Sequence, residues 1–234
     1  MEHRFSRTEL VLGTDTLTRL KATKVAVVGV GGVGGYVVEA LARSGIGALI
    51  LVDHDVVSIS NLNRQIIALE STLGRPKVEV MAERVAQINP NCKVEAHQVY
   101  YEKDIHHDLI SRDVDFVADA IDSVGAKADL IERSLHTQIA IISSLGMGNK
   151  LDPSHIEITD ISDTHTCPLA RAVRLALRKR GINQGVPVVF SKEPSVGKKR
   201  GRLPGSTSFV PPAAGLLMAS WIVRQVSIFD DKEA

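Results

Sequence analysis

The stretch Val27-Val-Gly29-Val-Gly31-Gly-Val-Gly34-Gly35 separates an apolar run, residues 24–28, from a helix-length periodic segment, residues 34–44. It contains the pattern G-x-G-x-x-G between an expected strand and an expected helix. Glycines in this context let backbone N–H groups approach a phosphate at the positive end of the helix. A turn that merely packs a helix against a strand is the alternative, and it agrees less well with the flanking pattern. The sequence therefore predicts a nucleotide-binding turn.

The rest of the chain alternates short apolar runs with helix-length segments, which is typical of a largely parallel sheet. Strands are expected at 24–28, 48–52, 93–99, 116–120, 139–143, 156–161 and 186–191. Helices are expected at 34–44, 76–88, about 103–111, 124–136, 168–180 and 213–228. The predicted fold class is α/β, with a Rossmann-like, mostly parallel sheet flanked by helices and a less regular C-terminal extension.

The sequence shows no clear linker, so we expect one domain over residues 1–234. Its nucleotide-binding half would cover residues 1–145, and residues 146–234 would serve the substrate and a dimer contact. The stretch 191–208 is rich in Gly, Pro, Ser and Lys and is expected to be a mobile loop.

Composition restricts the protein class. Of the 234 residues, 44% are hydrophobic, which is enough for a sizeable core, and the net charge is +1. Cys92 and Cys167 fall in no C-x-x-C pair, so neither a disulfide framework nor a structural zinc is predicted. Because the chain shows neither a signal-peptide pattern nor an apolar run of about 18 residues, we expect a cytoplasmic protein without a membrane association.

Asp53 follows the second expected strand. A carboxylate at this place can bind the hydroxyl pair of a ribose in NAD or in ATP. The glycines and Asp53 alone therefore favour a dehydrogenase, and they leave an NAD-dependent oxidoreductase or a nucleotide-binding protein without catalysis open.

Three further motifs separate these alternatives. They are Leu51-Val-Asp53-His-Asp55-Val-Val-Ser-Ile-Ser60-Asn61-Leu62-Asn63-Arg64-Gln65, Gly74-Arg75-Pro76-Lys77 and Asp119-Ala-Ile-Asp122-Ser123. In this order they resemble the ATP site of the ubiquitin-activating superfamily, which includes the adenylating enzymes of thiamine and molybdopterin sulfur transfer. A dehydrogenase has no use for Arg64 and Lys77.

The resemblance implies ATP and Mg²⁺ as cofactors and assigns roles to individual residues. The nucleotide-binding set is Gly29, Gly31, Gly32, Gly34, Asp53, Asp55, Asn61, Arg64, Gln65, Lys77 and Asp122. Within it Asp53 takes the ribose, Asn61 and Arg64 take the phosphates, Lys77 neutralises the leaving pyrophosphate and Asp122 coordinates Mg²⁺. Taken singly, Arg64 and Lys77 could be solvated charges, and Asp122 could be a helix N-cap.

The N-terminal segment Arg4-Phe5-Ser-Arg7 resembles the part of the superfamily that crosses to another subunit and brings an arginine to the triphosphate. The resemblance implies a homodimer in which Arg7 is catalytic together with Arg64, Lys77 and Asp122. Alternatively, Arg7 is only a charge on the face of a helix.

Within the superfamily, thioester-forming members use a catalytic cysteine. Cys167 follows His165-Thr166, but a small apolar residue beside a helix start is the commoner explanation for it. Longer stretches at 39–47, 77–92, 151–161 and 168–171 are similar to the bacterial tRNA threonylcarbamoyladenosine dehydratases. That family implies ATP-dependent cyclisation of the threonylcarbamoyl group on tRNA, through a carboxylate acyl-adenylate that requires no protein thiol.

Two basic segments lie outside these motifs. They contain Arg171, Arg174, Arg178, Lys198, Lys199 and Arg200. They suit contacts to tRNA phosphates, and a solvated helix face and loop is the alternative. Adenylation of the C-terminal glycine of a ubiquitin-like sulfur carrier also stays open from the sequence. A partner from a sulfurtransferase system is a further open possibility.

Overall fold

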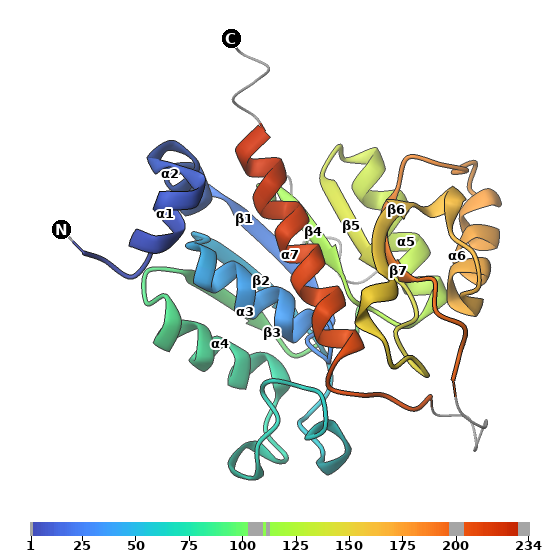
Figure 1. The fold of residues 1–234 in the computed structure, drawn as a ribbon, viewed down its shortest axis with the longest axis horizontal. Helices are drawn as coiled ribbons and strands as arrows, with labels where there is room; N and C mark the ends of the chain where they lie inside the picture. Colours follow the sequence, from blue (N-terminus) through green and yellow to red (C-terminus); the bar gives the residue numbers. More distant parts are fainter. Residues whose placement is uncertain (1, 103–109, 111–112, 197–203, 229–234) are drawn as a thin grey trace.

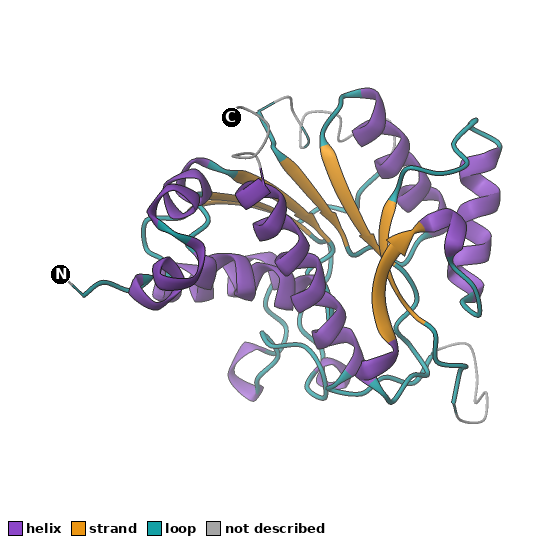
Figure 2. Cartoon of the chain, turned by 45° about the horizontal axis from the view of Figure 1, so that its top comes forward, coloured by secondary structure: helices purple, strands orange, loops and turns teal. Residues whose placement is uncertain are grey.

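A seven-stranded sheet lies at the centre of the computed structural model, which describes residues 2–102, 110, 113–196 and 204–228 (Figures 1 and 2). The strands are β1 (Lys24–Val28), β2 (Ala48–Val52), β3 (Lys93–His97), β4 (Phe116–Asp119), β5 (Ala140–Ser144), β6 (Ile156–Asp160) and β7 (Pro187–Ser191). Their spatial order is β3-β2-β1-β4-β5-β7-β6, and every neighbouring pair is parallel except β6 and β7. The predicted Rossmann-like, mostly parallel sheet is confirmed.

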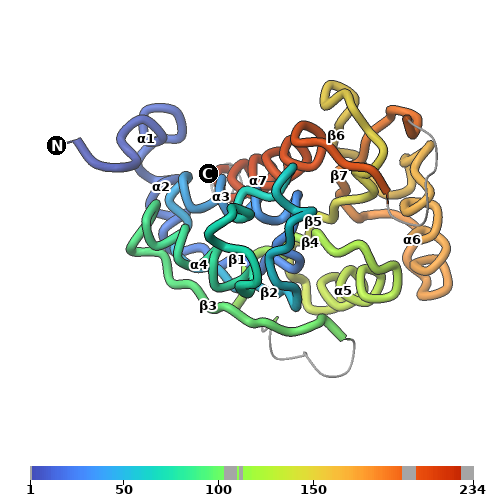
Figure 3. The backbone as a smooth tube through the Cα atoms, turned by 90° about the horizontal axis from the view of Figure 1, so that it is seen from below, coloured from blue at the N-terminus to red at the C-terminus, as the bar shows by residue number. Residues whose placement is uncertain are grey.

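Seven α-helices flank the described part of the sheet. They are α1 (Ser6–Leu12), α2 (Thr14–Ala22), α3 (Gly34–Ser44), α4 (Lys77–Ile88), α5 (Val124–His136), α6 (Pro168–Arg178) and α7 (Val210–Ile228). Figure 3 shows α3 and α7 on one side of the sheet and α5 on the other. Because helices cover both faces, the inner strands β1, β2 and β4 are buried and mostly apolar on both faces instead of alternating with exposed polar residues.

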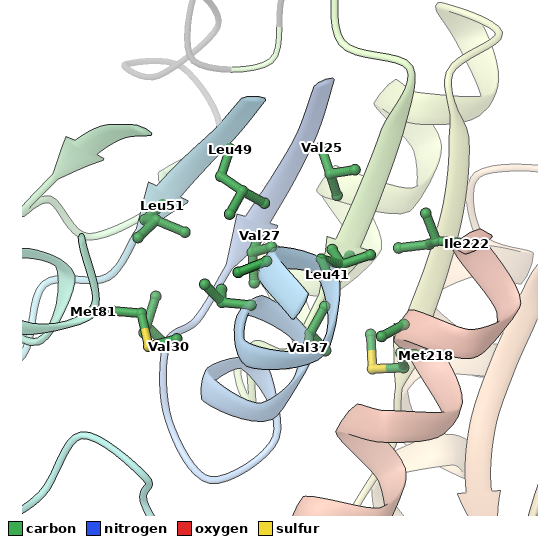
Figure 4. Close-up of a cluster of buried hydrophobic side chains, with 14 of the residues drawn as sticks. Val25, Val27, Val30, Val37, Leu41, Leu49, Leu51, Met81, Met218 and Ile222 are labelled. Carbon is green, nitrogen blue, oxygen red and sulfur yellow. The ribbon is translucent and has the colours of Figure 1, made fainter. Parts of the chain in front are cut away.

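Successive side chains of β1 point to opposite faces and so enter different cores. Val25 and Val27 pack in a cluster with Leu41 of α3 and with Met218 and Ile222 of α7 (Figure 4). The neighbouring positions of β1 face the second cluster, which is built with α5 and α6. The two cores fix α3, and thereby the glycine turn in front of it, against the C-terminal end of β1.

Several predicted elements differ from the structure at their ends. The helix predicted at 213–228 begins at Val210, because proline at 211 and 212 is tolerated in a first helical turn. The helix expected at 103–111 lies outside the described residues apart from Ile110. Helix α2 was not predicted, although the spacing of its buried Leu17 and Leu20 is a helical signal.

The stretch 191–208, expected to be a mobile loop, is irregular after β7 in the residues that the structure describes, and several of those residues are anchored. Ser191 is a buried residue of β7, and Glu193 is buried with its carboxylate accepting from the backbone N–H groups of Leu151 and Asp152. Gly205 is hydrogen-bonded to Asn149, and the carbonyl oxygen of Ser206 accepts from Asn63. The C-terminal half therefore extends the same sheet and contributes a wall to the site. No helix in the described parts of the chain has the length and apolar character that a bilayer span requires.

Candidate nucleotide-binding and active site

A cleft with a volume of about 350 Å³ opens at the C-terminal ends of β1, β2 and β4. The chain leaves β1 toward β2 on one side, whereas β4 lies on the other, so the cleft is at the topological switch point where open α/β sheets bind ligands. Its size falls in the range of small-molecule sites. The lining includes Gly29, Gly31, Gly32, Asp53, Asp55, Asn61, Arg64, Gln65, Lys77 and Asp122. Residues from motifs that are distant in the sequence therefore line one cleft.

Two glycines of the turn are required by close backbone approaches. Gly29 has a φ of 91°, and a Cβ there would lie 2.7 Å from the carbonyl oxygen of Ala120. Gly34 does not line the cleft: a Cβ at Gly34 would lie 1.8 Å from the carbonyl oxygen of Gly29. Gly34 thus allows α3 to approach β1, while the other glycines leave the cleft floor open for a phosphate.

Asp53 organises the loops on both sides of the cleft. Its Oδ2 accepts from the N–H of Val30 at 2.6 Å, and its Oδ1 accepts from the N–H of Asp55 at 2.9 Å. An ionised carboxylate offers about four acceptor positions, so free lone pairs remain for hydroxyl donors. The side chain can therefore hold the glycine turn in place and bind a ribose.

Lys77 reaches the cleft from the first turn of α4. Val57 N–H donates to the carbonyl oxygen of Arg75 at 2.9 Å and Lys77 N–H donates to that of Asp55 at 3.1 Å, which brings the loop after β2 beside the start of α4. As a result Lys77 Nζ donates to Asp55 Oδ2 at 2.6 Å, and His54 Nε2 lies 3.1 Å from Asp55 Oδ1. The buried lysine is therefore paired, and it is not the solvated surface charge considered from sequence.

Arg64 and its neighbours form the opposite wall. Arg64 Nη1 donates to the carbonyl oxygen of Ser60 and to Asn63 Oδ1, both at 3.0 Å, and other guanidinium N–H groups remain for a ligand. Asn61 Oδ1 accepts from the N–H of Ser58 at 3.0 Å, so part of this amide is used locally. Gln65 is buried, and among the described residues its Oε1 has no hydrogen-bond partner. Buried polar atoms normally have a partner, so this oxygen suits a hydrogen-bond donor from a molecule bound in the cleft.

Asp122 lies at the exposed rim of the cleft, in the loop between β4 and α5. Behind it is a network that the sequence reasoning missed. Asp119, fully buried, accepts from Lys127 Nζ at 2.8 Å, from Ser143 Oγ at 2.6 Å and from Ile121 N–H at 3.1 Å. The network ties the Asp122 loop to β5 and α5. In the sequence, this network is indicated only by Lys127, which lies about one helical turn after the motif at 119–123.

Two further walls were also missed. Residues 99–101 border the cleft after β3, where Tyr101 donates to Asp129 Oδ2 at 3.2 Å. Burial, and secondarily the charge of Asp129, raises the pKa of Tyr101, so this hydroxyl remains a donor at neutral pH. Residues 204–206, from the second half of the chain, form the other wall. Loop contacts between distant segments leave no periodic signal in a sequence.

The remaining predicted residues lie outside the cleft. Arg7 is exposed on α1 and does not line the cleft of its own chain. Cys167 is the buried N-cap of α6, and its Sγ accepts from Ala170 N–H at 3.5 Å. Burial raises the pKa of Cys92 to about 11, so this thiol is un-ionised at neutral pH.

The basic residues fall into two groups. Arg171 and Arg178 are exposed on α6, whereas the half-buried Arg174 donates at 2.7 Å to the carbonyl oxygen of Thr164 and also bonds the Thr164 hydroxyl. Arg174 therefore fastens α6 to the preceding turn. Lys198, Lys199 and Arg200 lie outside the described residues.

Comparisons with known proteins agree with this geometry. The sequence model of the ThiF family matches residues 5–233. A tRNA threonylcarbamoyladenosine dehydratase of Bacillus subtilis is 45% identical over 97% of this chain and 95% of its own length. The Escherichia coli tRNA N6-threonylcarbamoyladenosine dehydratase has a similar structure in complex with AMP, with 36% identity, a TM-score of 0.92 and coverage of 98% of this chain and 96% of that one. Its complex with ATP gives 35% identity, a TM-score of 0.91 and coverage of 99% and 96%. The chain belongs to the ThiF family of adenylating enzymes, as its ATP-site motifs predicted.

Proposed function

We propose that this protein uses ATP to dehydrate the threonylcarbamoyl group of an adenosine in the tRNA anticodon loop. The observation that carries the proposal is one cleft in which Asp53, Arg64, Lys77 and Asp122 meet beside a glycine turn. The substrate class is supported by a relative of the same name that matches the chain over nearly its whole length. A sulfur-carrier substrate and NAD chemistry have no comparable support.

The reaction begins at the threonylcarbamoyl carboxylate. One carboxylate oxygen attacks the α-phosphorus of ATP, the bond from that phosphorus to the bridging oxygen breaks, and pyrophosphate leaves. The product is an acyl-adenylate. The carbamoyl group of the same substrate then attacks the activated carbonyl carbon, closes a five-membered ring and releases one N–H proton to solvent. AMP leaves with the former carboxylate oxygen, so the substrate loses the elements of one water.

Cations and acids in the cleft suit the first step. Arg64 binds the triphosphate and Lys77 stabilises the charge that develops on pyrophosphate, because fixed charges in a site stabilise a transition state without reorganising. Asp53 accepts from the ribose hydroxyls. Asn61 and Gln65, which both border the cleft, supply amide contacts to the nucleotide.

The cleft also fits Mg²⁺. Asp122 and Asp55 are exposed in it, and Mg²⁺ is usually bound by one or two carboxylates together with substrate phosphates. Asp122 would hold the ion. The carboxylates of Asp53 and Asp55 and the imidazole of His54 form a second group of possible ligands, whose ligand atoms lie within 4.8 Å of one another. When bound, Mg²⁺ neutralises phosphate charge.

The second step needs no protein nucleophile. An intramolecular nucleophile can have an effective molarity of about 10⁵ M or more, so an external thiol adds little. This agrees with the buried position of Cys167 as a helix cap. The role of the protein in ring closure is to hold the acyl-adenylate and to keep water away from it.

Further assignments belong to the same proposal. The protein acts as a homodimer in which Arg7 of one subunit completes the ATP site of the other. Arg7 is exposed on α1, where a second subunit can reach it. Arg171, Arg178 and the basic residues 198–200 contact tRNA phosphates. The cytoplasm, where tRNA is modified and thiols stay reduced, is the expected location.

The proposal is tested by nucleoside analysis. Purified protein, ATP and Mg²⁺ are incubated with tRNA that carries the threonylcarbamoyl group, the tRNA is digested, and the modified nucleoside is followed by mass spectrometry. Loss of one water from the nucleoside, dependent on ATP, supports the function. An unchanged nucleoside despite demonstrated ATP binding would refute it.

A further inference from the structure

The carboxamide of Asn63 connects two walls of the cleft. Its Oδ1 accepts from Arg64 Nη1 at 3.0 Å, and its Nδ2 donates to the carbonyl oxygen of Ser206 at 2.9 Å. Arg64 belongs to the loop after β2, whereas Ser206 lies in the segment between β7 and α7. One amide therefore joins the guanidinium of Arg64, which lines the cleft, to a backbone segment from the second half of the chain.

Residues 204–206, which all line the cleft, are called the strap here. The strap is hydrogen-bonded to Asn63 and to Asn149. On the side away from Asn63, Asn149 holds Gly205 by two hydrogen bonds. Asn149 N–H donates to the carbonyl oxygen of Gly205 at 2.8 Å, and Gly205 N–H donates to Asn149 Oδ1 at 2.7 Å. Asn149 has a φ of 57°, a left-handed conformation that asparagine tolerates better than most residues.

Close packing adds to these bonds. A Cβ at Gly148 would lie 2.7 Å from Pro204 Cβ, so the loop after β5 touches the strap directly. Asn149 carbonyl oxygen also accepts from Val196 N–H at 2.7 Å. The strap is thus clamped between the loop after β5 and the loop that bears Arg64.

We infer that Asn63 is a positioning residue. It couples the orientation of the Arg64 guanidinium to the position of the strap. The inference rests on the proposed function, in which Arg64 binds the triphosphate. Arg64 Nη1 is held by two acceptors, one of them the Asn63 amide, and that amide is in turn held by the strap. An arginine that is already held in its binding orientation loses less conformational entropy when it binds phosphate. Loosening the strap should therefore weaken ATP binding even when Arg64 itself is unchanged.

The test uses Asn63→Ala, Asn149→Gly and the double variant. Asn63→Ala removes the acceptor for Arg64 and the donor to Ser206. Asn149→Gly keeps a residue that adopts positive φ readily, but it removes the acceptor for Gly205 N–H. Asn183→Ala, an exposed asparagine outside the cleft, is the matched control. The dissociation constant of a non-hydrolysable ATP analogue is measured without tRNA, together with amide hydrogen exchange of residues 205–208.

Asn63→Ala should weaken binding of the analogue about tenfold, as expected for one charge-assisted hydrogen bond. Asn149→Gly should accelerate amide exchange in residues 205–208 and also weaken binding of the analogue, by about threefold or more. Because both act through the strap, the double variant should lose less affinity than the product of the two single effects.

Unchanged affinity in Asn149→Gly despite faster exchange would overturn the coupling, and so would independent, multiplicative effects in the double variant. Asn63→Asp provides a second check, since it retains an acceptor for Arg64 but loses the donor to Ser206, and it should also accelerate exchange in the strap. Failure of the wild-type protein to bind the analogue at all would instead refute the proposed function.

Discussion

Lys77 Nζ donates to Asp55 Oδ2 over 2.6 Å, although only 5% of the lysine side chain is exposed against 49% of the aspartate side chain. The pair lies at the rim of the cleft, with the lysine inside and the carboxylate facing solvent. A buried ammonium is stable only with a partner, and Asp55 provides it before any phosphate arrives. Lys77 can then share its three N–H donors between Asp55 and a pyrophosphate oxygen.

Replacing Lys77 by alanine should lower turnover by about 10²-fold or more, which corresponds to roughly 3 kcal/mol of lost transition-state stabilisation. The measurement is kcat for pyrophosphate release with modified tRNA, with thermal unfolding recorded to establish that the variant is folded. Lys93→Ala, at an exposed position of β3, is the control and should retain wild-type turnover. Normal turnover in a folded Lys77→Ala protein would remove the adenylation assignment of this residue.

The buried pair of Asp119 and Lys127 should matter chiefly for stability. Lys127→Met leaves the Asp119 carboxylate without its cation, and removing one partner of a buried pair costs about 3–5 kcal/mol. Urea unfolding monitored by circular dichroism gives the change in the free energy of unfolding. The double variant Asp119→Leu with Lys127→Met should be more stable than Lys127→Met alone. If the urea midpoint of Lys127→Met equals that of the wild-type protein, the network does not stabilise the loop between β4 and α5.

The homodimer proposal predicts complementation between two inactive proteins. Arg7→Ala and Lys77→Ala subunits should regain activity when they are dissociated and mixed, because one of the two sites in a heterodimer then has both wild-type residues. Sedimentation and a tagged-subunit assay establish that exchange occurred. A monomer at the working concentration, or complete exchange without recovery, would contradict a contribution of Arg7 from the other subunit.

The two exposed arginines of α6, Arg171 and Arg178, should contribute to tRNA binding. Arg171→Ala with Arg178→Ala should weaken tRNA binding and reduce the slope of log affinity against log salt by about 0.7 to 0.9 for each lost phosphate contact. Neutralising Lys198, Lys199 and Arg200 together should act in the same way, with little change in ATP affinity. Binding measured over a salt titration decides this, and an unchanged slope would mean that these side chains are merely solvated.

The features that the sequence predicted correctly depend on short stretches of consecutive residues. Apolar runs and the G-x-G-x-x-G turn predicted the strands and the nucleotide end of the sheet, and motif resemblance brought Asp53, Arg64 and Lys77 to one cleft. The pairing of Asp55 with Lys77, the buried Asp119 network and the strap depend on how loops meet in space. Arg174 shows this as well. From the sequence it could not be distinguished from Arg171, but in the structure it donates to the carbonyl oxygen of Thr164 and so anchors α6.

Transfer of a labelled oxygen tests the acyl-adenylate most directly. The carboxylate of the threonylcarbamoyl group is prepared with ¹⁸O, and the modified tRNA is incubated with the protein, ATP and Mg²⁺ in unlabelled water. If the carboxylate attacks the α-phosphorus, each dehydration transfers one ¹⁸O atom to AMP, and mass spectrometry of AMP detects it. AMP free of the label in a reaction that still dehydrates the nucleoside would contradict the account.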